Sequence, residues 1–103
     1  MKEITKIILD WRDSRDWDKG DANNPKDLAI GISTEAAEIL EHFRFMNGDV
    51  LDTYIKEHTE DIGDELADTL YCIIALADVL GIDLEEAVVK KLEKSAKKYS
   101  AKT

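Results

Sequence analysis

Two pairs of acidic residues have the spacing of one helical turn. The first pair is Glu35 and Glu38, and the second is Glu65 and Asp68. Residues three apart lie on the same face of an α-helix, so each pair presents two carboxylates side by side. Carboxylate oxygens are the ligands that Mg²⁺ and Mn²⁺ prefer. If two helices bring the pairs together, the four carboxylates form a site for such a cation.

The distance between the pairs permits this arrangement. Twenty-six residues separate Glu38 from Glu65, which is enough to end one helix, turn and return antiparallel. The acids from Glu57 to Asp68 also repel one another at helical spacing, at a cost of about 1–2 kcal/mol to the isolated helix. Acids favour helix N-termini, but Glu65 lies beyond the first turn, where that effect fades. From the pattern alone, a metal site and a solvated acidic face both remain open.

Hydrophobic periodicity predicts the helices that carry these pairs. A first short helix has an apolar stripe from Ile4 to Trp11, and a polar loop follows over residues 16–24. A second helix opens at Pro25 and runs to Asn47 and Gly48. The residues of its predicted buried stripe are Leu28, Ile32, Ala36, Ile39, Phe43 and Met46.

The second half of the chain predicts two further long helices. Residues 49–56 are either a short helix or an ordered loop, and a third helix should run from about Glu57 to Leu80. Gly81 should close it, and Asp83 should cap a fourth helix with a lysine-rich end. The predicted fold is therefore an all-α bundle of four to five helices, in a single domain over residues 1–103.

One segment of the third helix, Leu70–Ala77, is apolar on all sides. A helix without a polar face must be covered all round, which four helices of a monomer do not easily achieve. We therefore expect self-association, with this segment between subunits and the bundle completed by homo-oligomerisation.

Composition narrows the class of protein. The 103 residues carry a net charge of −9, which argues against general binding of nucleic acid or of anionic membranes. The single cysteine, Cys72, fits a reducing compartment. No apolar run approaches the roughly 20 residues that span a bilayer. We expect a cytoplasmic protein without a membrane or nucleic-acid partner.

The paired acids also support a family resemblance. Glu35-x-x-Glu38, the spacer and Glu65-x-x-Asp68 resemble the ExxE…ExxD signature of the MazG-like superfamily of all-α nucleoside triphosphate pyrophosphohydrolases. The resemblance covers about residues 11–99 and is strongest to the single-domain, dCTP-pyrophosphatase-like branch. Its supporting motifs are Arg15-Asp16-Trp17, Pro25-Lys26-x-Leu28 and Gly81-Ile82-Asp83-Leu84, with Lys91 and Tyr99 on the last helix.

The resemblance implies hydrolysis of a (d)NTP to the monophosphate and pyrophosphate with Mg²⁺, or with Mn²⁺ in its place. It makes Glu35, Glu38, Glu65 and Asp68 the metal ligands, and it makes Glu38 or Glu35 the general base, with Glu38 favoured. The implied role is sanitation or balance of the nucleotide pool, on dCTP-like or non-standard deoxynucleotides. Homodimers or homotetramers are expected, with one pocket wall from a neighbouring subunit.

For the substrate, the resemblance places Trp17 and Phe45 around the base and Lys91 and Ser95 near the nucleotide. Phe45 stands where relatives carry a tryptophan, and Ser95 stands where they carry an asparagine. Relatives also have a histidine just before the Pro-Lys/Arg motif, where this chain has Asn23-Asn24. These departures affect substrate preference more than reaction type.

Two rival hypotheses remain. A di-iron helical bundle requires Glu-x-x-His pairs, and neither His42 nor His58 has a glutamate three residues before it. The stronger alternative is a non-enzymatic helical oligomerisation module with a solvated acidic face. That module predicts no metal dependence and no need for Trp17 near the acids.

Overall fold

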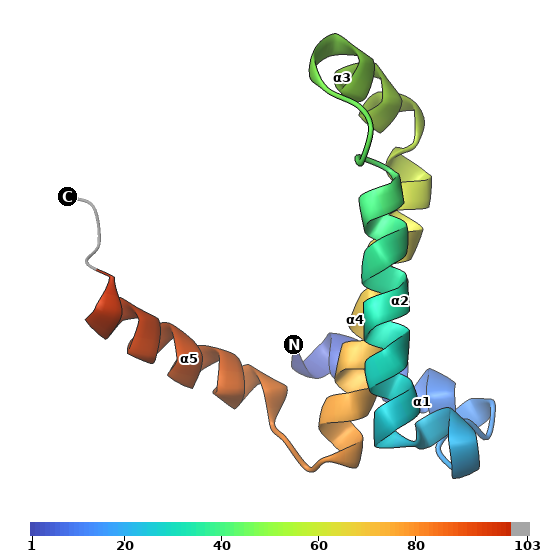
Figure 1. Cartoon of the computed structure of the whole chain (residues 1–103). Helices are drawn as coiled ribbons and strands as arrows, with labels where there is room; N and C mark the ends of the chain where they lie inside the picture. Colours follow the sequence, from blue (N-terminus) through green and yellow to red (C-terminus); the bar gives the residue numbers. More distant parts are fainter. Residues whose placement is uncertain (100–103) are drawn as a thin grey trace.

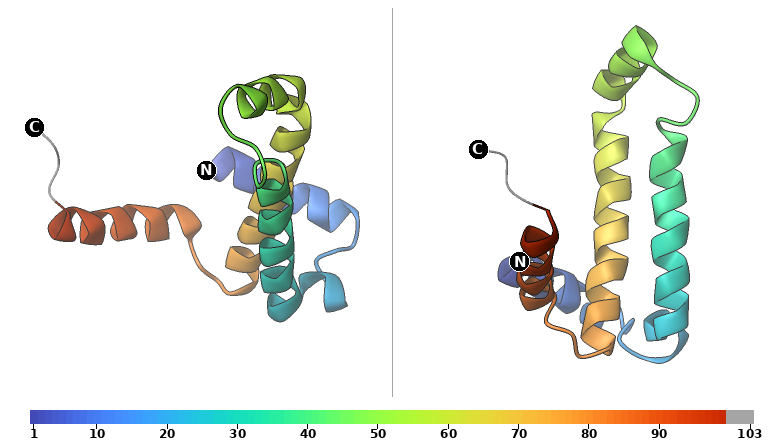
Figure 2. Two further views of the ribbon diagram at one scale, coloured as in Figure 1. Left: turned by 45° about the horizontal axis from the view of Figure 1, so that its top comes forward. Right: turned by 60° about the vertical axis from the view of Figure 1, so that its left-hand side comes forward.

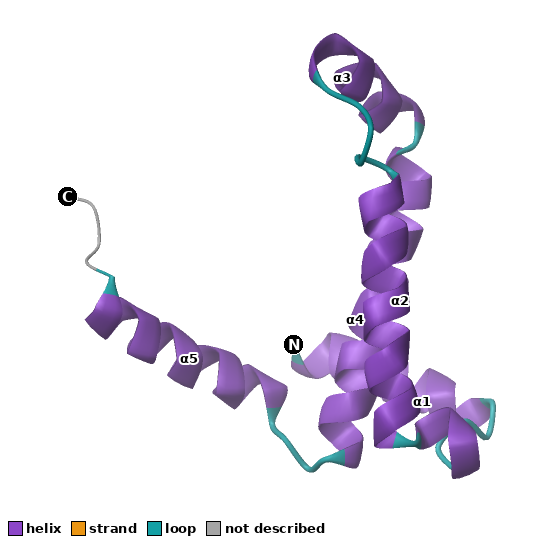
Figure 3. Cartoon of the chain, viewed as in Figure 1, coloured by secondary structure: helices purple, strands orange, loops and turns teal. Residues whose placement is uncertain are grey.

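The computed structural model describes residues 1–99, except the side chains of residues 21 and 22. Within this part the chain is all-helical and contains no strand, as predicted (Figure 3). The elements in order are α1 (Lys2–Ser14), the short 3-10 helix η1 (Gly20–Asn23), α2 (Pro25–Glu41), α3 (Gly48–Glu57), α4 (Thr59–Val79) and α5 (Leu84–Lys98). None of these helices is long and apolar enough to cross a bilayer.

Helices α2 and α4 run antiparallel, side by side, and form the centre of the molecule (Figures 1 and 2). Helix α2 begins where the sequence predicts, with Pro25 in its first turn. Asn24 caps it, because its side chain accepts from the backbone N–H of Lys26 at 2.9 Å and of Asp27 at 3.2 Å.

The predicted end of α2 at Asn47 and Gly48 is wrong. The helix ends at Glu41, and residues 42–45 form tight turns before α3. The backbone N–H of His42 donates to the carbonyl of Ile39, three residues before it, at 3.1 Å, which is the hydrogen bond of a tightened last turn. The apolar period continues past this point because Phe43 and Met46 are still half-buried. Residues 49–56, left open by the sequence, lie in α3.

A glycine allows α2 and α4 to approach closely. A Cβ atom placed on Gly31 would lie only 3.1 Å from the Sγ atom of Cys72. Because Gly31 is one turn before Glu35 on α2, this contact sets the helix separation near the acidic pairs. The Cys72 thiol is half-buried there, and burial raises its pKa.

The turn between α4 and α5 follows the sequence prediction. Gly81 has a φ of +67°, and the N–H of Ile82 donates to the carbonyl of Ala77 at 2.8 Å, so the glycine ends α4. Asp83 then caps α5 by accepting from the N–H of Glu86 at 3.0 Å. Helix α5 projects away from the α2/α4 pair (Figure 1).

The expectation that Leu70–Ala77 needs a second subunit to cover it is wrong for its central residues. Ile74 is 2% exposed, and Ala75 and Ala77 are also buried within one chain. Their cover comes from α2 and α1, both of which pack against α4. Large exposed apolar side chains lie elsewhere, including Ile30 and Leu40 on α2 and Leu92 on α5.

Candidate functional site

Three of the four predicted carboxylates meet between α2 and α4. Glu35, Glu38 and Glu65 each offer an oxygen atom, and these atoms lie within 4.8 Å of one another. The antiparallel packing of the two helices places the pair on α2 opposite Glu65 on α4. The sequence prediction that the two pairs converge is therefore confirmed for these three residues.

Two oxygen atoms of this group have no partner in the described part of the chain. They are Oε2 of Glu35 and Oε2 of Glu65, and both are buried. A buried polar atom without a hydrogen bond costs free energy. The group consists only of carboxylate oxygens, the donors that suit Mg²⁺ or Mn²⁺. A divalent cation would satisfy both oxygens, so the residues present fit such an ion.

The crowding of acids shifts their protonation. A proton shared with Glu38, together with burial and the nearby Glu35, raises the pKa of Glu65 to about 7. Burial is the main cause that raises the pKa of Glu35, and the charges of Glu38 and Asp68 act in the same direction. Like charges held this close favour a shared proton or a bound cation.

Asp68, the fourth predicted ligand, lies outside the group of three. It is exposed and sits one turn after Glu65 on α4. Its charge still contributes to the raised pKa of Glu35, so it lies near the group. The structure thus places Asp68 at the edge of the carboxylate group.

Trp17 belongs to an aromatic group formed by the end of α1, the following loop and Tyr71 on α4. Its ring packs edge-on against Trp11 at 5.0 Å and against Tyr71 at 6.5 Å, measured between ring centroids. Trp17 remains 43% exposed, so a planar ligand can reach it. Sequence reasoning missed Tyr71 as a member of this group. The available signal was its position three residues after Asp68, on the same side of α4.

The other predicted substrate residues are not brought to Trp17 within one chain. Phe45 follows α2, is 81% exposed and has the Arg44 guanidinium 4.9 Å from its ring centroid. It lies in the turns after α2, and no aromatic contact joins it to Trp17 or Tyr71 in the described part of the chain. Lys91 and Ser95 lie on α5, which projects away from the α2/α4 pair (Figure 1).

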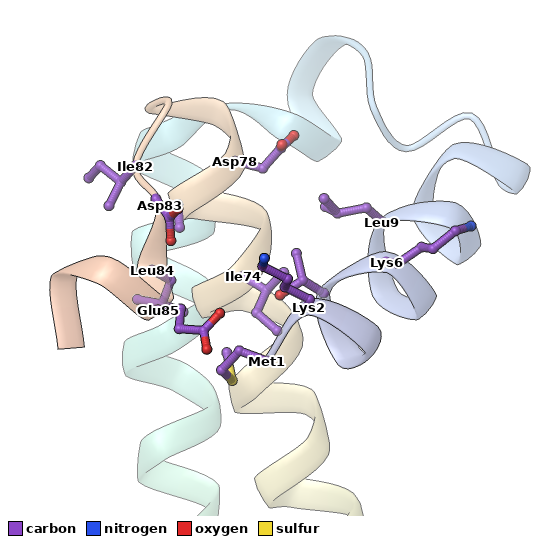
Figure 4. Close-up of a pocket in the computed structure, with 12 residues that line it drawn as sticks. Met1, Lys2, Lys6, Leu9, Ile74, Asp78, Ile82, Asp83, Leu84 and Glu85 are labelled. Atoms are coloured by element: carbon purple, nitrogen blue, oxygen red, sulfur yellow. The ribbon is translucent and has the colours of Figure 1, made fainter. Parts of the chain in front are cut away.

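A cavity of about 360 Å³ lies away from the carboxylates, between the start of α1, the end of α4 and the start of α5 (Figure 4). Ile74 and Leu9 give it an apolar floor, and Lys2 and Glu85 lie at its edge. None of the predicted site residues lines it. It is therefore separate from the candidate metal centre.

Comparisons with known proteins identify the family of this chain. The MazG-like family matches residues 30–103. The chain is 24% identical over 105 residues to dCTP pyrophosphatase 1 of Mus musculus, a match that covers 96% of this chain, and it is 23% identical to the Bos taurus protein of the same name. The chain spans only 58% of the length of the mouse relative.

A solved structure extends the likeness to the fold. The crystal structure of a pyrophosphatase from Archaeoglobus fulgidus superposes with a TM-score of 0.83 at 35% sequence identity. The match covers 98% of this chain and 93% of that one. With its all-helical fold and its facing ExxE and ExxD pairs, the chain belongs to the MazG-like family.

Proposed function

We propose that this protein is a divalent-cation-dependent nucleoside triphosphate pyrophosphohydrolase that releases a nucleoside monophosphate and pyrophosphate. The observation that carries the proposal is the carboxylate group of Glu35, Glu38 and Glu65, in which two buried oxygens lack partners. The names of the relatives, dCTP pyrophosphatase and pyrophosphatase, support the reaction class. We further propose a deoxynucleotide substrate, which the name of the mouse relative supports, and a role in the nucleotide pool.

In this reaction the carboxylates have two tasks. Glu35 and Glu65, whose Oε2 atoms are buried without a hydrogen-bond partner, would hold the cation, with Asp68 at the edge as a further ligand. Mg²⁺, when bound, supplies positive charge that neutralises the triphosphate. Glu38 is the most exposed of the group of three, so it is placed to accept the proton of an attacking water.

The water oxygen forms a new bond to phosphorus as the bond on one side of the α–β bridging oxygen breaks. The proton goes to Glu38, and the products are the monophosphate and pyrophosphate. The aromatic group at Trp17 is the proposed site for the base, because its exposed ring can stack on a planar heterocycle.

Self-association forms part of the proposal. The accessible surface of the chain is 7964 Å², whereas a compact monomer of this mass exposes about 5,800 Å². The excess of about 2,100 Å² exceeds the roughly 800 Å² that one partner buries in a standard interface. We therefore propose a homodimer or homotetramer, in which α5 with Lys91 and Ser95 reaches the nucleotide of a neighbouring subunit. Phe45 has the same proposed role.

The direct test incubates the pure protein with Mg²⁺ and each of the eight common (d)NTPs and separates the products. Monophosphate and pyrophosphate are expected, and excess EDTA should stop the reaction. Diphosphate with orthophosphate, or full activity in EDTA, would contradict the proposal. Absence of turnover on every nucleotide would favour the non-enzymatic oligomerisation module.

A further inference from the structure

The rings of His42, Tyr54 and His58 contact one another where α2 ends and α3 is followed by α4. The Nδ1 atom of His42 lies 2.7 Å from the hydroxyl oxygen of Tyr54. The Tyr54 ring stacks on His58 with centroids 3.8 Å apart and an angle of 13° between the planes. His58 Nδ1 in turn donates to the Tyr54 carbonyl at 2.9 Å. All three side chains are half-buried, so each ring limits the motion of the next.

His42 lies next to the candidate metal centre. It follows Glu38 by four residues, and its backbone still has helical angles, with φ −69° and ψ −21°. Residues four apart on a helix are neighbours on one face, with Cβ atoms about 6 Å apart. The imidazole is therefore one turn beyond the carboxylates, on the same side of α2.

The positions of Tyr71, the carboxylates and His42 along the α2/α4 pair indicate how a bound nucleotide would be oriented. On α4, Tyr71, which packs against Trp17, lies six residues after Glu65, or about 9 Å along the axis. On the antiparallel α2, His42 lies about 6 Å from Glu38 in the opposite direction. A nucleotide with its base at Trp17 and its phosphates at the carboxylates would therefore extend its terminal phosphates toward His42.

We take the Tyr54 hydroxyl as the donor in its contact with Nδ1 of His42. When the Tyr54 hydroxyl donates to Nδ1, the neutral imidazole carries its proton on Nε2. That N–H is then a free donor. When this N–H donates to a negatively charged oxygen of the terminal phosphates, the result is a charge-assisted hydrogen bond.

We propose that His42 is a phosphate-binding residue that donates from Nε2 to the terminal phosphates, which leave as pyrophosphate, and that Tyr54 is its positioning residue. The proposal rests on the proposed function of the carboxylate site. It adds a residue that the ExxE and ExxD pairs do not include, and it assigns opposite ends of the site to the two products.

Inhibition by the two products, measured separately, tests the phosphate-binding end at His42 and the base-binding end at Trp17. His42→Leu should weaken inhibition by pyrophosphate about tenfold, the effect of losing one hydrogen bond to a charged group. Inhibition by the nucleoside monophosphate should change by less than about twofold. His42→Gln, which keeps a side-chain donor, should recover part of the loss. Trp17→Leu is the opposite control, because it should weaken inhibition by the monophosphate and leave that by pyrophosphate nearly unchanged.

Tyr54→Phe tests the positioning role without removing the imidazole. It should weaken pyrophosphate inhibition less than His42→Leu but with the same selectivity. A long-range ¹H–¹⁵N NMR correlation reads the tautomer independently of activity. In the wild type it should show the proton on Nε2 of His42, and this preference should be lost in Tyr54→Phe. Addition of Mg²⁺ and pyrophosphate should shift the His42 Nε2 signal, while the His58 signals serve as the internal reference.

Equal weakening of both products, or no weakening in an active His42→Leu enzyme, would overturn the role of His42. An unshifted His42 Nε2 signal at saturating pyrophosphate would also overturn that role. This NMR result uses the wild-type protein, so it stands even if His42→Leu does not fold. A wild-type protein without turnover would instead overturn the proposed function. The two failures are thus distinguishable.

Discussion

Arg12 and Asp78 are 66 residues apart in the sequence, and the guanidinium of the first donates to the carboxylate of the second at 2.9 Å. The Arg12 side chain is buried and also pairs with Asp13 at 2.9 Å. Its backbone carbonyl accepts from the N–H of Trp17 at 3.1 Å. One residue thus joins α1, α4 and the loop that carries the proposed base-binding tryptophan.

Arg12→Met should therefore destabilise the protein and loosen Trp17. The loss of hydrogen bonds to charged groups predicts a decrease in the free energy of unfolding of about 2 kcal/mol. The near-ultraviolet circular dichroism of the packed Trp11 and Trp17 rings should fall, and KM should rise more than kcat falls. Lys6→Met removes the exposed ion pair with Asp10 and serves as the control, with an effect below about 1 kcal/mol. Equal stability of the two variants would contradict the role of Arg12.

The carboxylate group makes a second prediction. Replacement of Glu35, Glu38, Glu65 or Asp68 by alanine should abolish turnover, because each removes a proposed ligand or the base. The fold should remain intact or become more stable in the metal-free protein, since one repulsive charge is gone.

Glu41→Ala is the matched control for this series. Glu41 also lies on α2, but it is exposed and pairs with Arg44 at 3.0 Å. Its removal should leave activity nearly unchanged. Near wild-type activity of Glu65→Ala would exclude the proposed ligand set.

Local sequence signals predicted much of this architecture. Pro25 at the start of α2, the Gly81 turn and the Asp83 cap each depend on residues within one or two turns, so the sequence alone was sufficient. The end of α2 was wrong, because half-buried Phe43 keeps the apolar period beyond the last helical residue. Ala36 was also predicted to be buried and is exposed.

The sequence predicts the positions of site residues that depend on helical spacing. It does not predict positions that depend on contacts between distant segments. The helical spacing of Glu35, Glu38 and Glu65, taken together with the family resemblance, predicted that they converge. Nothing local indicates that Arg12 is buried, since its partner Asp78 comes from the far end of α4. The partnership of Trp17 with Tyr71 depends in the same way on the path of the loop across α4.

A third prediction concerns pH. The pKa of Glu65 is raised from 4.5 to about 7 in the folded chain, so the folded state binds this proton more tightly than the unfolded state. The resulting stabilisation is full below about pH 4.5 and is lost as the pH rises through about 7. Glu65→Gln does not ionise, so it should have a higher Tm than the metal-free wild type at pH 8, and the difference should shrink toward pH 5.

Mg²⁺ should act in the opposite direction to the proton. It requires the deprotonated carboxylate, so its stabilising effect on the wild type should be large at pH 8 and should weaken as the pH falls below 7. Thermal melts at several pH values, with and without Mg²⁺, measure both effects. A difference between Glu65→Gln and wild type that does not vary with pH would contradict the shifted pKa.

A fourth prediction uses the contact between Gly31 and Cys72. Gly31→Ala should gain up to about 1 kcal/mol of helix propensity but must push against the Sγ atom at 3.1 Å, so the net change should be small. In a Cys72→Ala background the space is free, and the same substitution should stabilise the protein. A double-mutant cycle by urea denaturation measures this coupling. Additive effects of the two substitutions would contradict it.

The last prediction is assembly. Val88 and Leu92 lie one turn apart on α5 and are 47% and 63% exposed in the single chain. Because Leu92 is exposed in the monomer, Leu92→Glu should not unfold the subunit, but in an oligomer it would bury an unpaired charge. We expect it to dissociate the oligomer and to lose activity, since the proposed contribution of α5 to a neighbouring site is lost with assembly.

Lys90→Gln is the matched control, because it makes the same change in net charge on α5 at a residue whose local partner is Glu86. It should keep both assembly and activity. Light scattering during size-exclusion chromatography measures the mass, and the pyrophosphate assay measures turnover on the same fractions. A wild-type protein that is monomeric at micromolar concentration and fully active would contradict the proposed assembly. In that case each chain would bind and hydrolyse its nucleotide without help from a neighbouring α5.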